Sequence, residues 1–461
     1  MSGTTHERNC PMKPSTEGTR PQYSAPDLVT PAPDTTNTLP SPSPSNTSSD
    51  SSRQSVSEVD DKSEDAHGGT DSSAPSTDRS SFPALLAYYH PQALKGLDDA
   101  KAEFTRLRNV STDDIRAKVD SIQMAEILAK VTIGNIISVD HALTMGPEWS
   151  PEETFILCSL ADARRLCDGN PPRIPVIVIG SPDGRRMTIE DFLKTLETRQ
   201  TLDVHDFKDI PGEQGYIPHR LPSKDVIGSF KTRGNGKGAP MNMVNLGRVK
   251  DNAIPPCLQD RNDYKLIDLT RTDNGKAEEP SLDDFDDCVT FQLLATKGAA
   301  HLPHIDRHGV YTTALNEEGR KLWIMWPQLT FEELKSWRMG TIPDGGIAVY
   351  IGQGDMLIQP PNTLHSPVTL NDCLMTGTMH WHSSHLLDIL RYTKAAVEDP
   401  GITNEAMARQ FIPKMTRIIE QWKKDLAART ENHSDAYTWP PPEHLDECEE
   451  ILEASYSYFN I

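Results

Sequence analysis

Three residues of this sequence have the types and the spacing of a metal site. His304 and Asp306 lie two positions apart, and His365 follows in a later segment. Side chains two positions apart on a β-strand project from the same face, so this imidazole and this carboxylate would converge on one point. Two histidines and one carboxylate on one side of an ion leave three coordination positions open, as oxygen-activating Fe(II) requires. A structural zinc site would instead use four protein ligands.

The tripeptide His-Ile-Asp has a simpler interpretation, because a histidine on a strand is most often a hydrogen-bonded core residue. Further histidines crowd the same part of the sequence, namely His301, His308, His380 and His382. We expect these to support the site from outside the set of metal ligands or to lie on the surface. The elements around the tripeptide must decide between the two interpretations.

The elements that would position these residues are short strands. Between Cys288 and Trp381 the sequence alternates apolar segments with turns, which predicts a β-sandwich or a small barrel. The predicted strands are VTFQLLA, VYTTAL, KLWIMWP, GIAVYIG, DMLIQP, SPVTL and LMTGTMHW. His304 and Asp306 would lie at the end of one strand, and a proline stop after DMLIQP would bring His365 beside them.

Further elements precede this region. The run from Ile174 to Gly180 is apolar and β-branched, as in a buried strand, and Thr188 would cap a short helix after it. Residues 210–280 are rich in Gly, Pro, Asn and Asp, which predicts long loops.

The N-terminal part of the chain differs from its centre. Residues 1–81 are rich in Ser, Thr and Pro and poor in large apolar residues, which predicts a disordered tail. Residues 82–169 predict a helical accessory region, with capping motifs at Ser111 and Ser150.

Residues 396–461 predict a C-terminal helical extension. One of its helices has an apolar stripe from Phe411 to Leu426. Packing of this stripe against the barrel and a homodimer seam are the two interpretations that we consider.

The charge balance limits the partners. The chain has 46 Lys and Arg against 67 Asp and Glu, for a formal net charge of −21. That excess argues against binding to the phosphate backbone of nucleic acid, and it favours a basic peptide as partner. A charge that serves only solubility is the alternative.

The seven cysteines form no C-x-x-C pair, so neither a zinc module nor a disulfide framework is predicted. No signal peptide opens the chain, and no apolar run is long enough to span a membrane. We therefore expect an intracellular protein without a membrane partner, in the nucleus or the cytoplasm.

The most specific pattern surrounds His365. Residues 354–365 have the form G-D-x-x-x-x-P-x-x-x-x-H, which resembles the distal-histidine strand of JmjC proteins. Residues 290–306 resemble the strand that leads into the H-x-D motif of that family, and residues 319–323 resemble its G-x-K-x-W segment. The early apolar strand and the helix after it also match, so the resemblance spans residues 170–395.

The resemblance implies an α+β fold with a double-stranded β-helix (cupin or jelly-roll) core, a helical block before it and helices after it. It also implies Fe(II) bound by His304, Asp306 and His365, with 2-oxoglutarate as co-substrate and O2 as oxidant. In the family the lysine of the G-x-K segment binds the distal carboxylate of 2-oxoglutarate, and that role falls to Lys321. Arg320 is its rival, and an ordinary surface lysine is the remaining alternative.

A second donor for the co-substrate is expected on the strand VYTTAL. Thr312 or Thr313 lies near the position that the family uses for it. Hydroxyls that only line the barrel are the alternative.

The activity that the resemblance implies is oxidative, with 2-oxoglutarate decarboxylated to succinate while a C–H bond is hydroxylated. We predict a hydroxylase of a protein or peptide. A histone lysine demethylase is the first alternative, but such enzymes often contain zinc-based reader domains, which the cysteine pattern excludes. A catalytically silent cupin scaffold that binds protein partners is the second alternative, and the three intact ligands count against it.

Overall fold

The structure is a computed structural model of the chain. It describes residues 81–109, 114–145, 154–168, 171–180, 186–208, 218–247, 255–270, 289–338, 341–399, 402–403, 408, 410–428 and 437–459. All of them belong to the second of two compact units, Ser73–Ile461. The predicted disordered tail up to residue 80 and the capping residues Ser111 and Ser150 lie outside the described residues.

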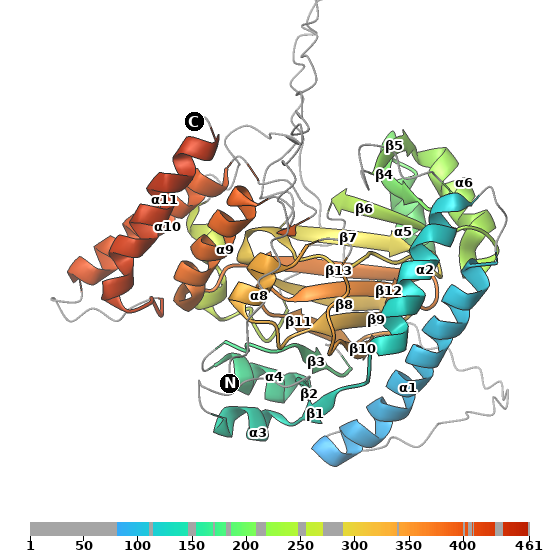
Figure 1. Cartoon of the computed structure of the whole chain (residues 1–461), viewed down its shortest axis with the longest axis horizontal. Helices are drawn as coiled ribbons and strands as arrows, with labels where there is room; N and C mark the ends of the chain where they lie inside the picture. Colours follow the sequence, from blue (N-terminus) through green and yellow to red (C-terminus); the bar gives the residue numbers. More distant parts are fainter. Residues whose placement is uncertain are drawn as a thin grey trace, which may run out of the picture. The chain divides into compact units, whose positions relative to one another are not determined.

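A ten-stranded sheet forms the centre of this unit, in the order β1-β2-β3-β11-β8-β13-β7-β6-β4-β5 (Figure 1). Its strands are β1 (Asn135–Ile137), β2 (Thr154–Cys158), β3 (Val176–Val178), β4 (Thr201–Asp206), β5 (His219–Pro222), β6 (Met241–Gly247), β7 (Thr290–Ala295), β8 (Tyr311–Glu318), β11 (Met356–Gln359) and β13 (Cys373–His380). β1, β2 and β3 pair in parallel, whereas β11 joins them to the rest of the sheet in antiparallel fashion.

A second sheet contains β10 (Ile347–Ile351), β9 (Lys321–Trp326) and β12 (Leu364–Thr369), in that order. The segment before β8 extends its edge through two isolated bridges, Ala300 with Val368 and His304 with His365. From β7 to β13 the chain thus passes back and forth between the two sheets, with β9 and β10 as an antiparallel pair within the smaller sheet. This winding is that of the predicted double-stranded β-helix.

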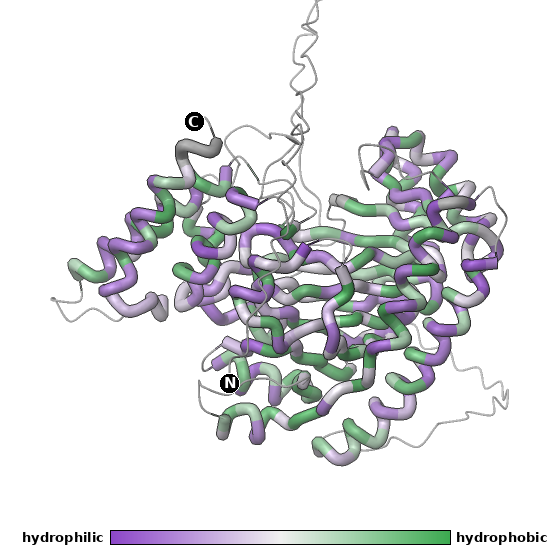
Figure 2. The backbone as a smooth tube through the Cα atoms, viewed as in Figure 1, coloured by the Kyte–Doolittle hydropathy of each residue, from purple (hydrophilic) through white to green (hydrophobic). Residues whose placement is uncertain are grey.

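All seven strands predicted between Cys288 and Trp381 are present, so the α+β class and the β-rich core are confirmed. Figure 2 shows hydrophobic residues concentrated on these strands. The early strand is confirmed as β3, and the Thr188 hydroxyl accepts a hydrogen bond from the Asp191 N–H at the start of α5 (Ile189–Leu196).

Two long helices lie on the N-terminal side, α1 (Phe82–Leu107) and α2 (Ile115–Lys130). One stripe of α1 is buried, and this helix contacts β9 and β10. Gly96 allows the close approach, because a Cβ there would lie 2.8 Å from the ring of Tyr350. The Tyr89 hydroxyl accepts a hydrogen bond from the backbone N–H of Tyr350 at 2.8 Å.

The expected helical region 82–169 needs a correction. It contains α1, α2, α3 (Val139–Thr144) and α4 (Leu160–Cys167), but also β1 and β2. The motif at Ser150 predicted a helix, whereas β2 begins at Thr154. Every residue of β2 is buried, and the apolar run of this strand pairs with β3 in the sheet. A continuous apolar segment of this kind favours a buried strand over a helix with one solvated face.

The expected long loops at 210–280 are only partly present. The described residues of this range contain β5, α6 (Ser223–Arg233), β6 and three short 3-10 helices. The apolar stripe of α6, which contains Val226, Ile227 and Phe230, is buried. The high Gly and Pro content of the range obscured this pattern in the sequence.

In the described residues after the last strand the α-helices are α9 (Leu386–Glu398), α10 (Phe411–Ala428) and α11 (Leu445–Phe459). The stripe of α10 is buried in one hydrophobic cluster with α9, α11 and the 3-10 helix Leu266–Thr270. Packing within the chain therefore accounts for the stripe. None of the helices in the described ranges combines the length and the apolar character that a membrane crossing needs.

Candidate metal centre

The structure brings His304, Asp306 and His365 together. Each offers a ligand atom that lies within 4.8 Å of those of the other two. His365 belongs to β12, and His304 pairs with it across the isolated bridge. The ring centroids of the two histidines are 4.4 Å apart, and Oδ1 of Asp306 lies 3.6 Å from Nε2 of His365. Both histidines are buried, so solvent does not compete strongly for their nitrogen atoms.

The hydrogen bonds of the two imidazoles determine which nitrogen can bind a metal. Nδ1 of His304 lies 2.8 Å from the carbonyl oxygen of Leu302, and Nδ1 of His365 lies 3.0 Å from that of Thr363. A carbonyl oxygen only accepts, so each Nδ1 must donate its proton. Each Nε2 therefore keeps its lone pair, as a metal ligand requires. Burial is the main cause that lowers the pKa of His365 well below its ordinary value, and the neighbouring His304 lowers it further. The low pKa also keeps that ring neutral.

The two oxygens of Asp306 have different surroundings. Oδ2 accepts a hydrogen bond from Oγ1 of Thr312 at 2.6 Å and one from Nε2 of Gln359 at 3.0 Å. Thr312 and Gln359 are directly opposite each other in the β8–β11 ladder. Oδ1 is the oxygen that faces His365. Gln359 was not among the residues predicted from the sequence, although a polar residue at the end of the apolar strand DMLIQP was a usable signal.

Thr313 does not join this group. It is next to Thr312 on β8 and projects to the opposite face of the sheet. There its hydroxyl lies 2.5 Å from that of Thr378, which in turn lies 2.7 Å from Nε2 of His380. Of the two candidate threonines, only Thr312 therefore reaches the metal ligands.

Lys321 is buried on the face of the small sheet that contains His365. It is the first residue of β9, and it shares a face with Met325, which is directly opposite His365 in the ladder. Lys321 and Met325 are four positions apart on β9, so Lys321 lies about 13 Å from His365 as measured along the strand. Burial lowers the pKa of Lys321, and the thiol of Cys373 opposes this shift. Among the described residues, its ammonium group makes no hydrogen bond or ion pair.

Trp323 lies on the same face of β9 as Lys321, between it and Met325, the residue opposite His365. Its ring stacks on that of His365, with centroids 5.2 Å apart and an interplanar angle of 24°. Its buried Nε1 has no hydrogen-bond partner in the described part of the chain. The motif at residues 319–323 includes Trp323 but does not predict this contact.

A second polar group adjoins His304. Nε2 of His301 lies 2.8 Å from the Asn242 amide, and the rings of His301 and His304 are 5.6 Å apart. The ring of His205 lies 5.4 Å from that of His301. Burial lowers the pKa of His205 to about 4 and that of His301 well below its ordinary value, so both are neutral at pH 7. His301 thus adjoins His304 without joining the three candidate ligands, and its supporting role stays a prediction. His308 is buried and stacks on Phe411, so it does not lie on the surface.

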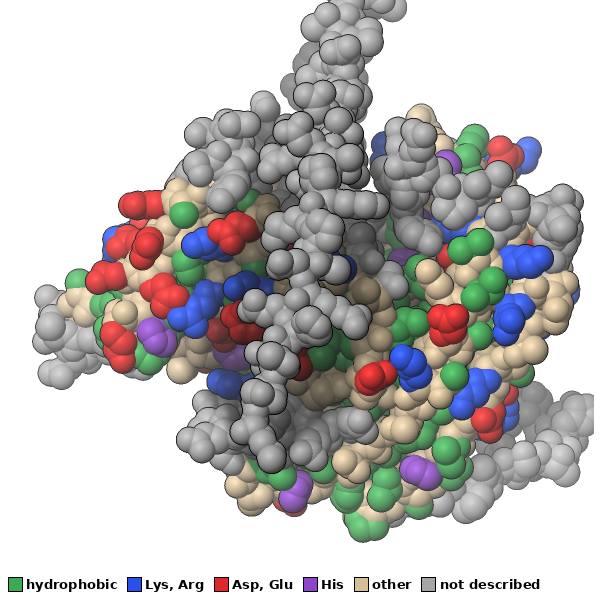
Figure 3. Space-filling view, viewed as in Figure 1, with side chains coloured by type: hydrophobic (Ala, Val, Ile, Leu, Met, Phe, Trp, Pro, Cys, Tyr) green, Lys and Arg blue, Asp and Glu red, His purple; other side chains and the backbone are tan. Residues whose placement is uncertain are grey.

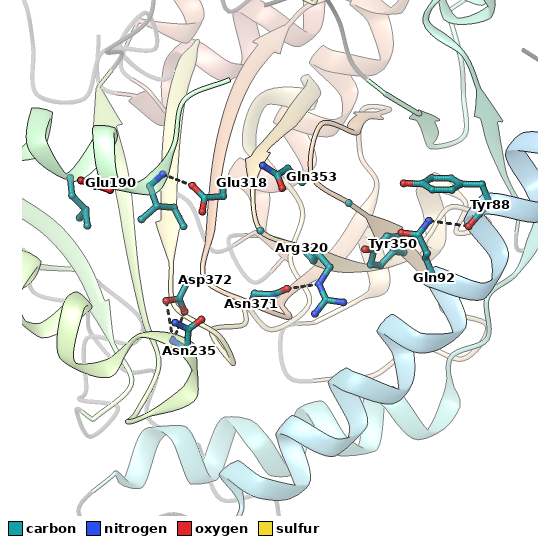
Figure 4. A pocket seen from close by; sticks show the side chains of 14 residues that line it. Tyr88, Gln92, Glu190, Asn235, Glu318, Arg320, Tyr350, Gln353, Asn371 and Asp372 are labelled. Atoms are coloured by element: carbon teal, nitrogen blue, oxygen red, sulfur yellow. Dashed lines mark hydrogen bonds between the residues drawn. The ribbon is translucent and has the colours of Figure 1, made fainter. Parts of the chain in front are cut away.

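Arg320, the rival of Lys321, lies outside this centre. Its Nε donates to Oδ1 of Asn371 at 2.5 Å, and it lines a pocket of about 730 Å³ (Figure 4). The polar groups of this pocket are largely paired with their own neighbours. Glu318 accepts from the Ile189 N–H, and Asp372 accepts from the Asn235 N–H. None of the three candidate metal ligands lines this pocket.

Comparison with protein families identifies one domain. Residues 276–388 match the model of the JmjC domain, and this range includes all six residues predicted for the site as well as Gln359. Comparison with curated proteins gave no match.

Proposed function

Because this chain contains a JmjC domain, we propose that it is an Fe(II)- and 2-oxoglutarate-dependent oxygenase. One observation carries the proposal: one ligand atom from each of His304, Asp306 and His365 converges with the other two, and each side chain is held by a further hydrogen bond. This donor set fits Fe(II), since it combines two imidazoles with one carboxylate, contains no thiolate and leaves coordination positions for other ligands. Iron with 2-oxoglutarate and O2 would supply the oxidising chemistry.

Lys321 supports a site for the co-substrate. A buried ammonium without a partner is costly, and a carboxylate would satisfy it. An extended lysine side chain and a short dicarboxylate together suit the distance between the Lys321 level and the metal ligands. The proposed role is to bind the distal carboxylate while the other end of the co-substrate reaches the metal. The Trp323 ring would border the space between Lys321 and the metal position, or would move to make room for the co-substrate.

We further propose that the substrate is a polypeptide residue that is hydroxylated at carbon. The groups next to His304 are two neutral imidazoles and the amide of Asn242. Such groups suit an uncharged polar side chain, because a methylated ammonium is better bound by carboxylates or aromatic faces. Demethylation of lysine is therefore the less favoured alternative.

The proposed substrate segment is basic. Acidic side chains gather on the C-terminal helices (Figure 3), and α11 contains Asp446, Glu447, Glu449 and Glu450. Binding of a basic segment should weaken as salt concentration rises, because salt screens exposed charges.

A silent scaffold fits these observations less well. A protein that only binds partners gains nothing from a buried lysine that pairs with no group among the described residues, or from two imidazoles held by hydrogen bonds at Nδ1. The triad and Lys321 together favour catalysis.

Anaerobic titration of the apoprotein with Fe(II) and 2-oxoglutarate tests the proposal. We expect one iron per chain and the visible absorption band of an iron chelate of 2-oxoglutarate. A protein that binds no iron would refute the oxygenase proposal. The substrate class is tested by mass spectrometry of cells with and without the protein, in which peptides that gain an oxygen atom indicate hydroxylation and loss of methyl groups indicates demethylation.

A further inference from the structure

The Asp306 carboxylate is held from one side only. Two donors share Oδ2, while Oδ1 is directed to the other ligands. Thr312 and Gln359 are only 3 % and 1 % exposed, so water does not replace either bond easily. Their strands are neighbours, and the two residues are a directly opposed pair, so the sheet itself sets the separation of the two donors.

We propose that Thr312 and Gln359 are positioning residues that keep Asp306 a one-oxygen ligand, which rests on the metal site proposed above. A carboxylate can bind a metal through one or both oxygens. With one oxygen bound, the two histidines and Asp306 occupy three positions of an octahedron and leave three open. With both bound, only two would remain. Two hydrogen bonds to Oδ2 oppose the second mode, because that oxygen would have to leave both donors.

The amide of Gln359 gives a second argument. The carboxylate oxygen only accepts, so Gln359 must present its NH2 group to Asp306. Its Oε1 is then buried without a partner in the described structure. An unsatisfied buried acceptor costs about 1 to 3 kcal/mol. A glutamine that served only the packing of the sheet would be expected to pair both ends, so this arrangement is consistent with selection for the bond to Asp306.

As a positioning residue for Asp306, Thr312 has a different role from that of the co-substrate donor that the sequence suggested. Its proton is used by Asp306, so it is not available as a donor to the co-substrate. Thr313 provides a matched control, since it is the same residue type on the same strand and its hydroxyl bonds on the opposite face of the sheet.

The experiment compares Co(II) binding to the full-length protein and to the variants Thr312→Val, Gln359→Leu, Thr312→Ser and Thr313→Val. Co(II) replaces iron because its visible spectrum reports coordination number and no turnover is needed. Thr312→Val and Gln359→Leu should each lower Co(II) affinity by about 10- to 100-fold and change the visible spectrum. Thr312→Ser keeps the hydroxyl and should restore both, and Thr313→Val should resemble the unmodified protein. Thermal unfolding of each apoprotein checks that it is folded.

The results distinguish this inference from the proposed function. If the unmodified protein binds Co(II), and Thr312→Val and Gln359→Leu bind it equally well with an unchanged spectrum, the positioning role is wrong and the metal site stands. The same conclusion follows if Thr313→Val has the effect of Thr312→Val, or if Thr312→Ser does not restore the spectrum. If the unmodified protein binds neither Co(II) nor Fe(II), both proposals fail.

Discussion

His304 and His365 exchange two backbone hydrogen bonds, with N–H to carbonyl distances of 3.0 and 2.9 Å. The two imidazoles are thus placed at the same level by the main chain, and neither side chain is needed for the pairing. The positions of these ligands are therefore part of the fold itself, whereas their metal affinity depends on the side chains.

Replacement of any one of His304, Asp306 and His365 by alanine should abolish stoichiometric Fe(II) binding and succinate formation while the fold persists. The backbone bridge remains in each variant, and within the described residues no fourth His, Cys, Asp or Glu joins the group of three. Iron content and far-UV circular dichroism measure the two effects. His301→Ala and His380→Ala are the controls and should retain iron. An iron-free His380→Ala protein would contradict this assignment of ligands.

Asp306→Asn should lose the metal almost completely, although its shape is nearly unchanged. Thr312 and Gln359 both donate, so the carbonyl of the new amide should turn to them and its NH2 group should face the metal position. An NH2 group has no lone pair suited to a metal. Affinity for Fe(II) should fall by more than the roughly 100-fold expected for a supporting residue. Adding Thr312→Val should recover part of this loss, and failure to do so would argue against the hydrogen-bond orientation.

Lys321→Ala should weaken 2-oxoglutarate binding by about 10- to 150-fold while iron remains bound, because one charge-assisted hydrogen bond is removed. Arg320→Ala should have little effect, since Arg320 lines the separate pocket. Lys321→Met should also raise the free energy of unfolding of the apoprotein, because burial disfavours the charged form of Lys321 and the variant has an apolar side chain there. Calorimetric titration and urea unfolding provide the two measurements. Equal losses in the Lys321 and Arg320 variants would contradict the assignment.

The apoprotein should lose stability as pH falls from about 6.5 to about 4. Burial lowers the pKa of His380 to about 4, against an ordinary value of 6.5. Above pH 6.5 the ring is neutral in both states, so it adds no pH dependence. Below that value the unfolded chain takes up a proton that the folded chain excludes, and the free energy of unfolding falls by about 1.4 kcal/mol per pH unit for this histidine. His382 and His385 have pKa values lowered in the same direction by burial.

Urea unfolding of the unmodified protein and of His380→Gln at several pH values isolates this contribution. The variant should lose one histidine's share of the slope and keep the rest. Identical slopes for the two proteins would show that His380 is protonated in the folded state or is not buried as described.

The sequence predicted the seven strands of the core because each is a short apolar segment ended by turn residues. It also predicted, from spacing and local motifs, that His304, Asp306 and His365 converge, and the structure brings these three together. The co-substrate role of Lys321 follows from the family resemblance and stays a prediction. The sequence did not predict the bond from Gln359 to Asp306 or the stacking of Trp323 on His365. Such contacts depend on the register between strands that are distant in the sequence, and a local pattern contains no information on that register.

The errors in the N-terminal region have a similar cause. β2 is stabilised by pairing with β3 on one side and β1 on the other. Its apolar residues are equally compatible with a buried helix when the partners are not known. A capping motif at Ser150 then favoured the wrong element, because propensity is a weak guide where tertiary pairing decides.

The pairing of β3 with β11 has a consequence for biosynthesis. Val176 to Val178 lie opposite Met356 to Ile358, and β13, which completes the β-helix, ends at His380. During translation β3 therefore emerges long before its antiparallel neighbour exists. Until then the nascent chain exposes an apolar strand with one open edge, which favours aggregation. Folding of this β-helix should be slow and late, and newly made chains should depend on chaperones that shield β-strands.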